Sequence, residues 1–381
     1  MVIERTLNLF PLINQECNHQ LLLNAIRNER VANAYLFYGP SGSGHEGFAL
    51  EFAAMINCQN PPEIPCGHCK SCAKMKTLEH PNLNLIFPVP ISKDSSDNNP
   101  FSAVSTAEME EIQKSIQEKA KNPYLKISVP NAKHISIQFI RDTKHKLYLT
   151  SQESGWKVTV ILDAHLMTEQ AANAFLKILE EPPEKSTFIL TTSQADQLIP
   201  TIRSRCQPVF FPPLPSEQVA EYLKKAEIPE DQINLLIGLA GGSLERAIQL
   251  SQHDLAQLKA DTLDILRAIA VWNVKKIYNY TESLATLYRR DPEYFTQLLL
   301  SIAFWFRDAV VLQSGKAKSE MVHPDLESEI QKFSQAFSHF DAFGVYSAVE
   351  NCIDLARRNV YITLALQDLF FQIHNLMKPK T

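Results

Sequence analysis

Four cysteines lie close together in the first part of the chain, with the spacing Cys58-x7-Cys66-x2-Cys69-x2-Cys72. Two short CxxC steps can bring thiolates onto one tetrahedral metal ion, and four sulfur ligands complete the coordination of a structural Zn²⁺. The chain has seven cysteines in all, an odd total that argues against a disulfide framework. The spacing therefore predicts a closed zinc site. An iron–sulfur cluster and a set of free buried cysteines are the alternatives.

A glycine-rich loop follows an apolar strand and precedes a helical run, with Gly39, Gly42 and Gly44 before His45 and Glu46. This is the context of a phosphate-binding P-loop, in which backbone N–H groups and the positive end of a helix cradle phosphates. The pattern requires Lys and then Ser or Thr at the last two positions. A neutral His cannot replace the lysine charge, and Glu places a negative charge beside the phosphate. We interpret the loop as a degenerate nucleotide site, with a plain glycine turn as the alternative.

Polar residues end two other apolar runs and precede a third. Asp163 follows the run 157–162, where an acid could hold Mg²⁺, although the usual pair of acids is reduced to one. Thr192 ends the run 187–192 and is assigned to the same degenerate site. Ser204 and Arg205 precede the last apolar run, where an isolated arginine is by itself no more than a solvated surface charge.

The elements that must position these residues alternate in the first half of the chain. Short apolar runs rich in β-branched and aromatic residues are separated by helical stretches, and they occupy residues 34–38, 83–87, 157–162, 187–192 and 208–211. Such runs predict a five-stranded parallel sheet covered by helices on both faces. Residues 88–130 form an insertion of no evident role, with a polar loop at 92–100 and an exposed charged helix at 106–121.

Strand character stops where Pro212, Pro213 and Pro215 follow one another, because proline stiffens a linker and blocks helix continuation. Almost everything after them has helical period. We expect a helix capped by Ser216 and running through Tyr222. We also expect two helices within 229–250, broken at Gly241-Gly242, then longer ones around 298–312 and 342–375.

The length and net charge of the chain limit the classes of protein to which it can belong. A chain of 381 residues is too long for one compact core, so two or three domains are expected. A net charge of −5 argues against a stand-alone nucleic-acid binder. The first residues lack the layout of a signal peptide, and the longest apolar runs fall short of the roughly 20 residues that cross a bilayer. A cytoplasmic protein with no membrane partner is expected.

In this order the motifs resemble those of bacterial clamp-loader subunits of the delta-prime and gamma/tau type, which are AAA+ proteins. The resemblance covers nearly all of residues 1–250, and residues 256–381 match only in helical character. It rests on Asn33-Ala-Tyr-Leu-Phe, the four cysteines, His80-Pro-Asn, Asp163-Ala-His-Leu-Met-Thr, Asn173-Ala-Phe-Leu-Lys-Ile-Leu-Glu-Glu-Pro-Pro and Ile202-Arg-Ser-Arg-Cys. It implies an AAA+ α/β domain over 1–211 with the cysteine insertion at 58–72, a helical lid over 212–254 and an all-α collar over 255–381.

Departures from the family pattern favour the delta-prime type. Gamma/tau types carry an intact P-loop and an Asp-Glu pair. Here Leu162 stands at the metal-binding Asp position and Asp163 at the Glu position. The second ATP-sensing motif, Gly-Ser-x-Arg, has Glu245 in place of its arginine. Together with His45 and Glu46, four groups needed for ATP chemistry are replaced around one site. The resemblance thus implies a subunit with no ATPase activity of its own and an empty nucleotide site.

The resemblance also implies a role within a complex that acts in DNA replication. Arg205, with Ser204 beside it, would serve as an arginine finger at ATP bound by a neighbouring subunit. Gamma/tau and delta-type subunits are the implied partners, with the sliding clamp and primed DNA reached through the complex. Two alternatives stay open: a gamma/tau-like subunit that hydrolyses ATP itself, and a zinc-stabilised AAA+ adaptor.

Overall fold

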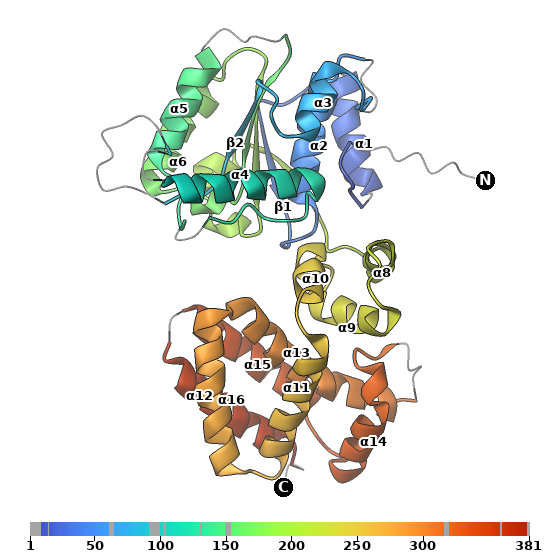
Figure 1. Cartoon of the computed structure of the whole chain (residues 1–381). Helices are drawn as coiled ribbons and strands as arrows, with labels where there is room; N and C mark the ends of the chain where they lie inside the picture. The colour runs from blue at the N-terminus through green and yellow to red at the C-terminus, as the bar shows by residue number, and fades with distance from the viewer. Residues whose placement is uncertain are drawn as a thin grey trace, which may run out of the picture. The chain divides into compact units, whose positions relative to one another are not determined.

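The computed structural model describes residues 9–13, 15–60, 65–90, 100–101, 104–129, 132–148, 154–315, 320–358 and 360–378. These residues form two compact units (Figure 1). One comprises the chain up to residue 214 together with residues 243–245. The other comprises residues 215–242 and the chain from residue 246 onward. Most of the predicted polar loop, residues 91–99, lies outside the described residues.

The first unit is built on a five-stranded parallel sheet in the order β2-β3-β4-β1-β5. The strands are β1 (Ala34–Tyr38), β2 (Leu83–Ile86), β3 (Lys157–Ile161), β4 (Ser186–Thr192) and β5 (Gln207–Phe210). The central strands β1, β3 and β4 are buried along almost their whole length, as their continuous apolar sequences require. Each strand lies within one residue of its predicted bounds. The prediction of a five-stranded parallel α/β domain is confirmed.

Helices cover both faces of this sheet (Figure 1). On one side lie α1 (Glu16–Arg27), α2 (His45–Asn57) and α3 (Lys70–Lys76), and on the other α5 (Ile137–Tyr148) and α6 (Glu169–Glu180). The short helix α7 (Pro200–Arg203) precedes β5. The core between the layers is rich in phenylalanine, and fully buried examples are Phe37, Phe52, Phe188 and Phe211.

The insertion contributes one helix, α4 (Thr106–Lys121), with the predicted bounds. A capping box fixes its start, because Ser105 accepts from the backbone of Glu108 while the Glu108 carboxylate accepts from the backbone of Ser105. Most of the helix is exposed, as predicted, but two of its residues are not. Ile112 and Lys119 are buried, the latter completely.

The second unit is entirely helical in its described residues. Its helices are α8 (Ser216–Lys225), α9 (Glu230–Ala240), α10 (Leu244–Ser251), α11 (Leu255–Ala270), α12 (Val274–Arg290), α13 (Pro292–Gln313), α14 (Glu327–Ala336), α15 (Ala342–Arg357) and α16 (Ile362–Leu376). The first residues of α10, Leu244 and Glu245, cluster with the first unit. Helix α13 is long and apolar enough to span a membrane, but 67% of its most apolar window is buried within the protein, as in a core helix.

Two expectations for this half differ from the structure. Ser216 is the first residue of α8 and not its cap, because Pro215 occupies the cap position. The single helix expected over 342–375 is in fact two helices: α15 ends at Arg357, and α16 begins at Ile362. The structure groups most of 212–254 with the helices that follow, so a separate lid and collar remain a prediction.

Candidate functional site

The four clustered cysteines converge in space. Their sulfur atoms all lie within 4.8 Å of one another, and the Cys66 and Cys72 sulfurs are 3.9 Å apart. Sulfur ligands at about 2.3 Å from a tetrahedral Zn²⁺ would be about 3.8 Å apart, so the spacing fits such an ion. Backbone N–H groups of Cys66, Cys69 and Cys72 point at the sulfurs of Cys58, Cys66 and Cys69. These contacts would stabilise thiolates, so the cluster is a candidate four-cysteine metal site.

The glycine loop lies between β1 and the first turn of α2, as the sequence predicts. Gly42 and Gly44 have φ values of 74° and 95°, a region that favours glycine. Residues 243–245 pack directly on the loop. A Cβ at Gly42 would lie 2.2 Å from the Ser243 hydroxyl, and the Leu244 N–H donates to the Gly42 carbonyl at 3.2 Å. The loop therefore joins a strand to a helix as a P-loop does, and residues 243–245 contact it.

His45 and Glu46 begin α2 and are both buried. Burial lowers the pKa of His45 to about 4, so the ring is neutral at pH 7, and its Nδ1 lies 3.0 Å from the Ser43 hydroxyl. Burial alone would raise the pKa of Glu46, but the ammonium group of Lys119 reverses the effect and lowers it to about 2. The first turn of α2 thus carries a neutral ring and a carboxylate where an intact P-loop carries a cation and a hydroxyl.

Asp163 and Thr192 lie at the ends of neighbouring strands. Asp163 takes a left-handed conformation with φ 48°, directly after β3 and Leu162. The Thr192 carbonyl accepts from the Gly39 N–H at 3.3 Å, and its hydroxyl lies 2.9 Å from His165 Nδ1. The carboxyl edge of the sheet therefore places Thr192 at the start of the glycine loop.

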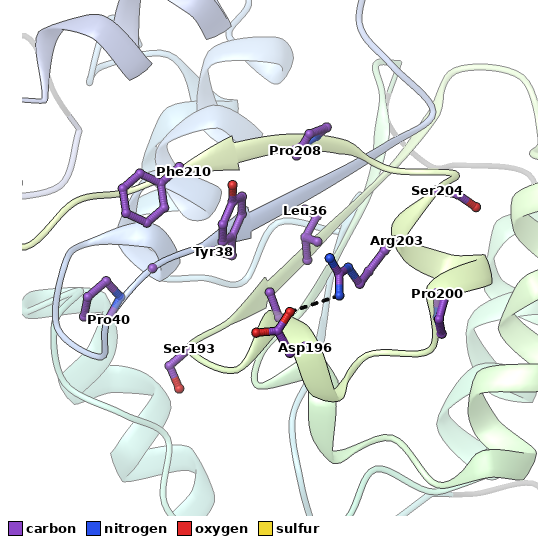
Figure 2. A pocket seen from close by; sticks show the side chains of 12 residues that line it. Leu36, Tyr38, Pro40, Ser193, Asp196, Pro200, Arg203, Ser204, Pro208 and Phe210 are labelled. Atoms are coloured by element: carbon purple, nitrogen blue, oxygen red, sulfur yellow. Dashed lines mark hydrogen bonds and ion pairs between the residues drawn. The ribbon is translucent and has the colours of Figure 1, made fainter.

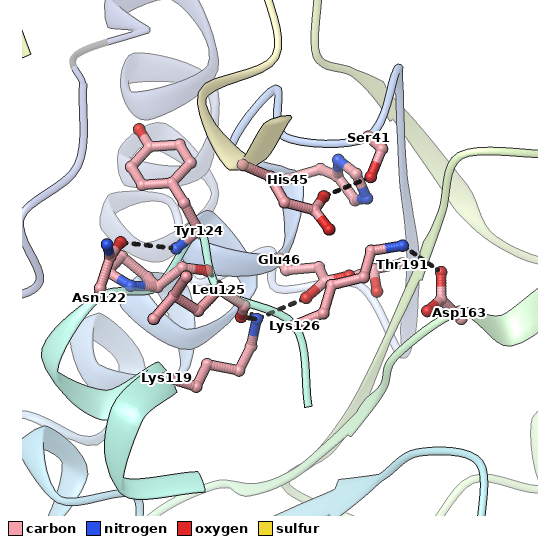
Figure 3. Close-up of polar contacts among 12 residues, drawn as sticks. Ser41, His45, Glu46, Lys119, Asn122, Tyr124, Leu125, Lys126, Asp163 and Thr191 are labelled. Atoms are coloured by element: carbon pink, nitrogen blue, oxygen red, sulfur yellow. Dashed lines mark hydrogen bonds and ion pairs between the residues drawn. The ribbon is translucent and has the colours of Figure 1, made fainter. Parts of the chain in front are cut away.

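Two lysines of the insertion, which sequence reasoning missed, complete this group (Figure 3). Lys119 Nζ donates to the Glu46 carboxylate at 2.5 Å, and Lys126 Nζ lies 3.6 Å from the Asp163 carboxylate. Glu245 also belongs to the group, since the Ser41 hydroxyl donates to its carboxylate. One signal could have revealed Lys119. It follows Ile112 by seven residues, and so falls on the apolar face of its helix.

Arg205 lies elsewhere, just after α7. Its guanidinium donates to the Glu180 carboxylate at 3.0 Å and to the Thr201 carbonyl at 3.2 Å, and 40% of its side chain is exposed. The Ser204 hydroxyl is exposed and donates to the same carbonyl. These contacts do not involve the residues of the glycine loop. The structure thus gathers the predicted nucleotide-site residues and leaves Arg205 to face outward.

An open pocket of about 990 Å³ lies between these two regions of the first unit (Figure 2). Its wall includes Gly39 and Pro40 at the start of the glycine loop and Ser204 from the arginine motif. Arg203 contributes to the wall while paired with Asp196 at 3.1 Å. The pocket is a concave, mixed polar and apolar surface next to the candidate site.

The sequence matches the family described as "DNA polymerase III, delta subunit" over residues 14–215. The chain is 26% identical over 316 residues to DNA polymerase III subunit delta' of Bacillus subtilis, covering 82% of each chain. It is 29% identical over 236 residues to DNA polymerase III subunit delta' of Pseudomonas aeruginosa, covering 61% of this chain and 60% of that one.

A further relative is DNA polymerase III subunit tau of B. subtilis, which is 24% identical over 344 residues. That match covers 84% of this chain but only 51% of the tau subunit, so the chain spans about half of that relative. The family match covers more than half of the chain and includes the glycine loop, the cysteine cluster and Arg205. The chain therefore belongs to the DNA polymerase III delta subunit family, as a delta-prime-like clamp-loader protein.

Proposed function

We propose that the chain is the delta-prime subunit of a DNA polymerase III clamp loader and helps to load the sliding clamp onto primed DNA. The family match and the two relatives named delta' support this role. As a replication protein it would act in the cytoplasm. Affinity purification of the tagged chain should recover gamma/tau and delta-type subunits. Recovery of none of them from growing cells would contradict the proposal.

We further propose that this subunit does not hydrolyse ATP. The observation that carries this proposal is the buried Glu46–Lys119 pair at the first turn of α2, next to the neutral His45. A triphosphate at this turn would meet the Glu46 carboxylate where an intact site offers a hydroxyl for Mg²⁺. Calorimetric titration of the isolated chain with Mg·ATP should show no binding in the micromolar range, and micromolar affinity would contradict this part.

In the proposed complex, Arg205 reaches the ATP of a neighbouring subunit as an arginine finger. Its partial exposure favours action on another subunit, and its contacts are with Glu180 and Thr201 and not with the chain's own glycine loop. A guanidinium is planar and permanently charged, and it makes bidentate contacts with phosphate that Lys cannot reproduce. Such a group stabilises the charge that develops on a transferred phosphoryl group.

The last helices of the second unit would form the collar that holds the subunits together. Leu364 and Phe371 lie seven residues apart on α16 and are 61% and 52% exposed. Val274 and Tyr278 are similarly exposed on α12, which packs against α16. Exposed apolar side chains that recur along the surface of a helix suit a protein–protein interface. Leu364→Ser with Phe371→Ser should weaken assembly of the complex, and unchanged assembly would contradict the proposed collar surface.

We propose Zn²⁺ as the ion of the cysteine cluster. Four thiolates are a soft ligand set, and a closed tetrahedral shell leaves no position for a substrate, so the ion would be structural. Cys69 also caps α3, which ties the cluster to the packing of α2 and α3. Zinc would therefore stabilise this corner of the first unit without taking part in ATP chemistry.

A further inference from the structure

Lys119 is an unusual residue because its ammonium group is completely buried. It donates to the Glu46 carboxylate at 2.5 Å, to the Pro123 carbonyl at 3.2 Å and to the Leu125 carbonyl at 2.8 Å. A lysine has three donors, so all of them are used. Burial of an unpaired ammonium is very costly, which means that these three acceptors are what keep Lys119 inside the protein. The end of the insertion helix is thereby fixed to the first turn of α2.

The chain after α4 folds over that same turn. Tyr124 lies against Gly44, since a Cβ there would be 3.4 Å from its ring, and Pro123 lies against Gly47, where the corresponding distance is 3.0 Å. The Tyr124 hydroxyl also accepts from the Ile13 N–H at 2.8 Å. In an intact P-loop, the junction of loop and helix is where phosphate binds. Here residues 123–124 of the chain itself lie against the junction.

Lys126 continues the same segment toward the sheet (Figure 3). Its ammonium lies 3.6 Å from the Asp163 carboxylate, and one-third of its side chain is exposed. Although partial burial disfavours the charged form, Asp163, Glu245 and Glu46 together raise the pKa of Lys126 above its ordinary value. Lys126 thus contacts Asp163, which follows β3, and its charge is also stabilised by Glu46 on α2 and by Glu245.

The charges of this group disfavour a phosphate ligand. Three carboxylates, those of Glu46, Asp163 and Glu245, are set against the two ammonium groups of Lys119 and Lys126. Among the described residues of this group the positive charge is already matched by carboxylates, so a triphosphate would add negative charge where the three acids outnumber the two ammonium groups.

We propose that residues 119–126 are a permanent internal occupant of the degenerate nucleotide site. Lys119 and Lys126 supply from within the chain the positive charge that a P-loop lysine and a bound Mg²⁺ supply in an intact site. Glu46, Asp163 and Glu245 are retained as their partners. This assigns a role to the insertion: it holds the glycine loop and residues 243–245 in one conformation whether or not ATP is present.

A rival role for the two lysines is to bind phosphate in place of the lost P-loop lysine. Amine labelling of the intact chain, followed by mass spectrometry with and without millimolar Mg·ATP, separates the two. Lys119 should react at least about tenfold more slowly than Lys121, which is exposed at the end of the same helix. Mg·ATP should change neither the labelling of Lys126 nor the melting temperature. Protection of Lys126 together with a rise in melting temperature would overturn the proposal in favour of the phosphate-binding role.

Substitution provides a second test of the same contact. Lys119→Met should lower the melting temperature far more than the matched control Lys121→Met, because Glu46 would lose its buried partner. Adding Glu46→Gln to Lys119→Met should recover part of this loss, since no unpaired charge would remain. Equal melting temperatures for the two lysine variants would contradict the proposal. If Lys119→Met does not fold, labelling of the wild-type chain still decides, because Lys119 and Lys121 reacting at equal rates would overturn it.

Discussion

The guanidinium of Arg205 lies 3.0 Å from the carboxylate of Glu180, the last residue of α6. Both side chains are about half exposed, and Arg205 also donates to the Thr201 carbonyl. These two contacts hold the guanidinium in one direction while part of it stays accessible. Glu180 belongs to the Glu-Glu-Pro-Pro segment, so two motifs that are 25 residues apart in sequence act on one side chain.

This contact makes Glu180 a positioning residue for the proposed finger. Exposed ion pairs contribute about 0–1 kcal/mol to folding, so Glu180→Gln should leave the melting temperature nearly unchanged. In the reconstituted complex the same variant should lower DNA- and clamp-stimulated ATPase, though by less than loss of Arg205. Glu181→Gln, the exposed neighbour, is the matched control and should be silent. A wild-type rate for Glu180→Gln would show that the contact does not position the finger.

Removal of the metal should weaken the first unit. Elemental analysis should find one zinc per chain, and Cys66→Ser should lose it and lower the melting temperature by about 5–10 °C, since metal binding is coupled to folding. Cys17→Ser changes an exposed cysteine outside the cluster and serves as the control. Metal-replete protein without zinc, or a disulfide among the four cysteines, would refute the site.

His45 should make stability depend on pH. Its pKa is lowered by burial from 6.5 to about 4, so the unfolded chain binds a proton more readily than the folded one. The contribution of neutral His45 to the free energy of unfolding is fully present above pH 6.5 and is lost as the pH falls through 4. Its full size is about 3 kcal/mol.

The variant His45→Gln isolates this effect, because Gln can still contact Ser43 but does not titrate. Between pH 7 and 4.5 its free energy of unfolding should fall by about 2 kcal/mol less than that of the wild type. A comparison with the variant is needed because burial raises the pKa of Glu51 from 4.5 to about 7, which acts in the opposite direction over this range. Parallel pH profiles for variant and wild type would contradict a buried neutral His45.

The sheet could be predicted closely because its strands are continuous apolar runs that only a buried parallel sheet accommodates. The break between α15 and α16 could not, since no glycine or proline lies between Arg357 and Ile362 to mark it. The cysteine cluster could be predicted because the short spacing of the four residues by itself brings their sulfur atoms together. Lys119 was missed because a lysine is ordinarily a surface charge, and its partner Glu46 lies 73 residues away in sequence. A pair of residues so far apart in the chain leaves only a weak signal in the sequence around either one.

The most direct measurement is the DNA- and clamp-stimulated ATPase rate of a complex reconstituted with Arg205→Ala. Arginine fingers elsewhere contribute roughly 10³ to 10⁵ in rate, but an assembly with several ATP sites should lose less overall. We expect normal assembly and a several-fold lower rate for Arg205→Ala. The control Arg203→Ala, which removes the neighbouring cation paired with Asp196, should keep the wild-type rate. If Arg205→Ala complexes assembled normally and hydrolysed ATP at the wild-type rate, the role proposed for Arg205 would be contradicted.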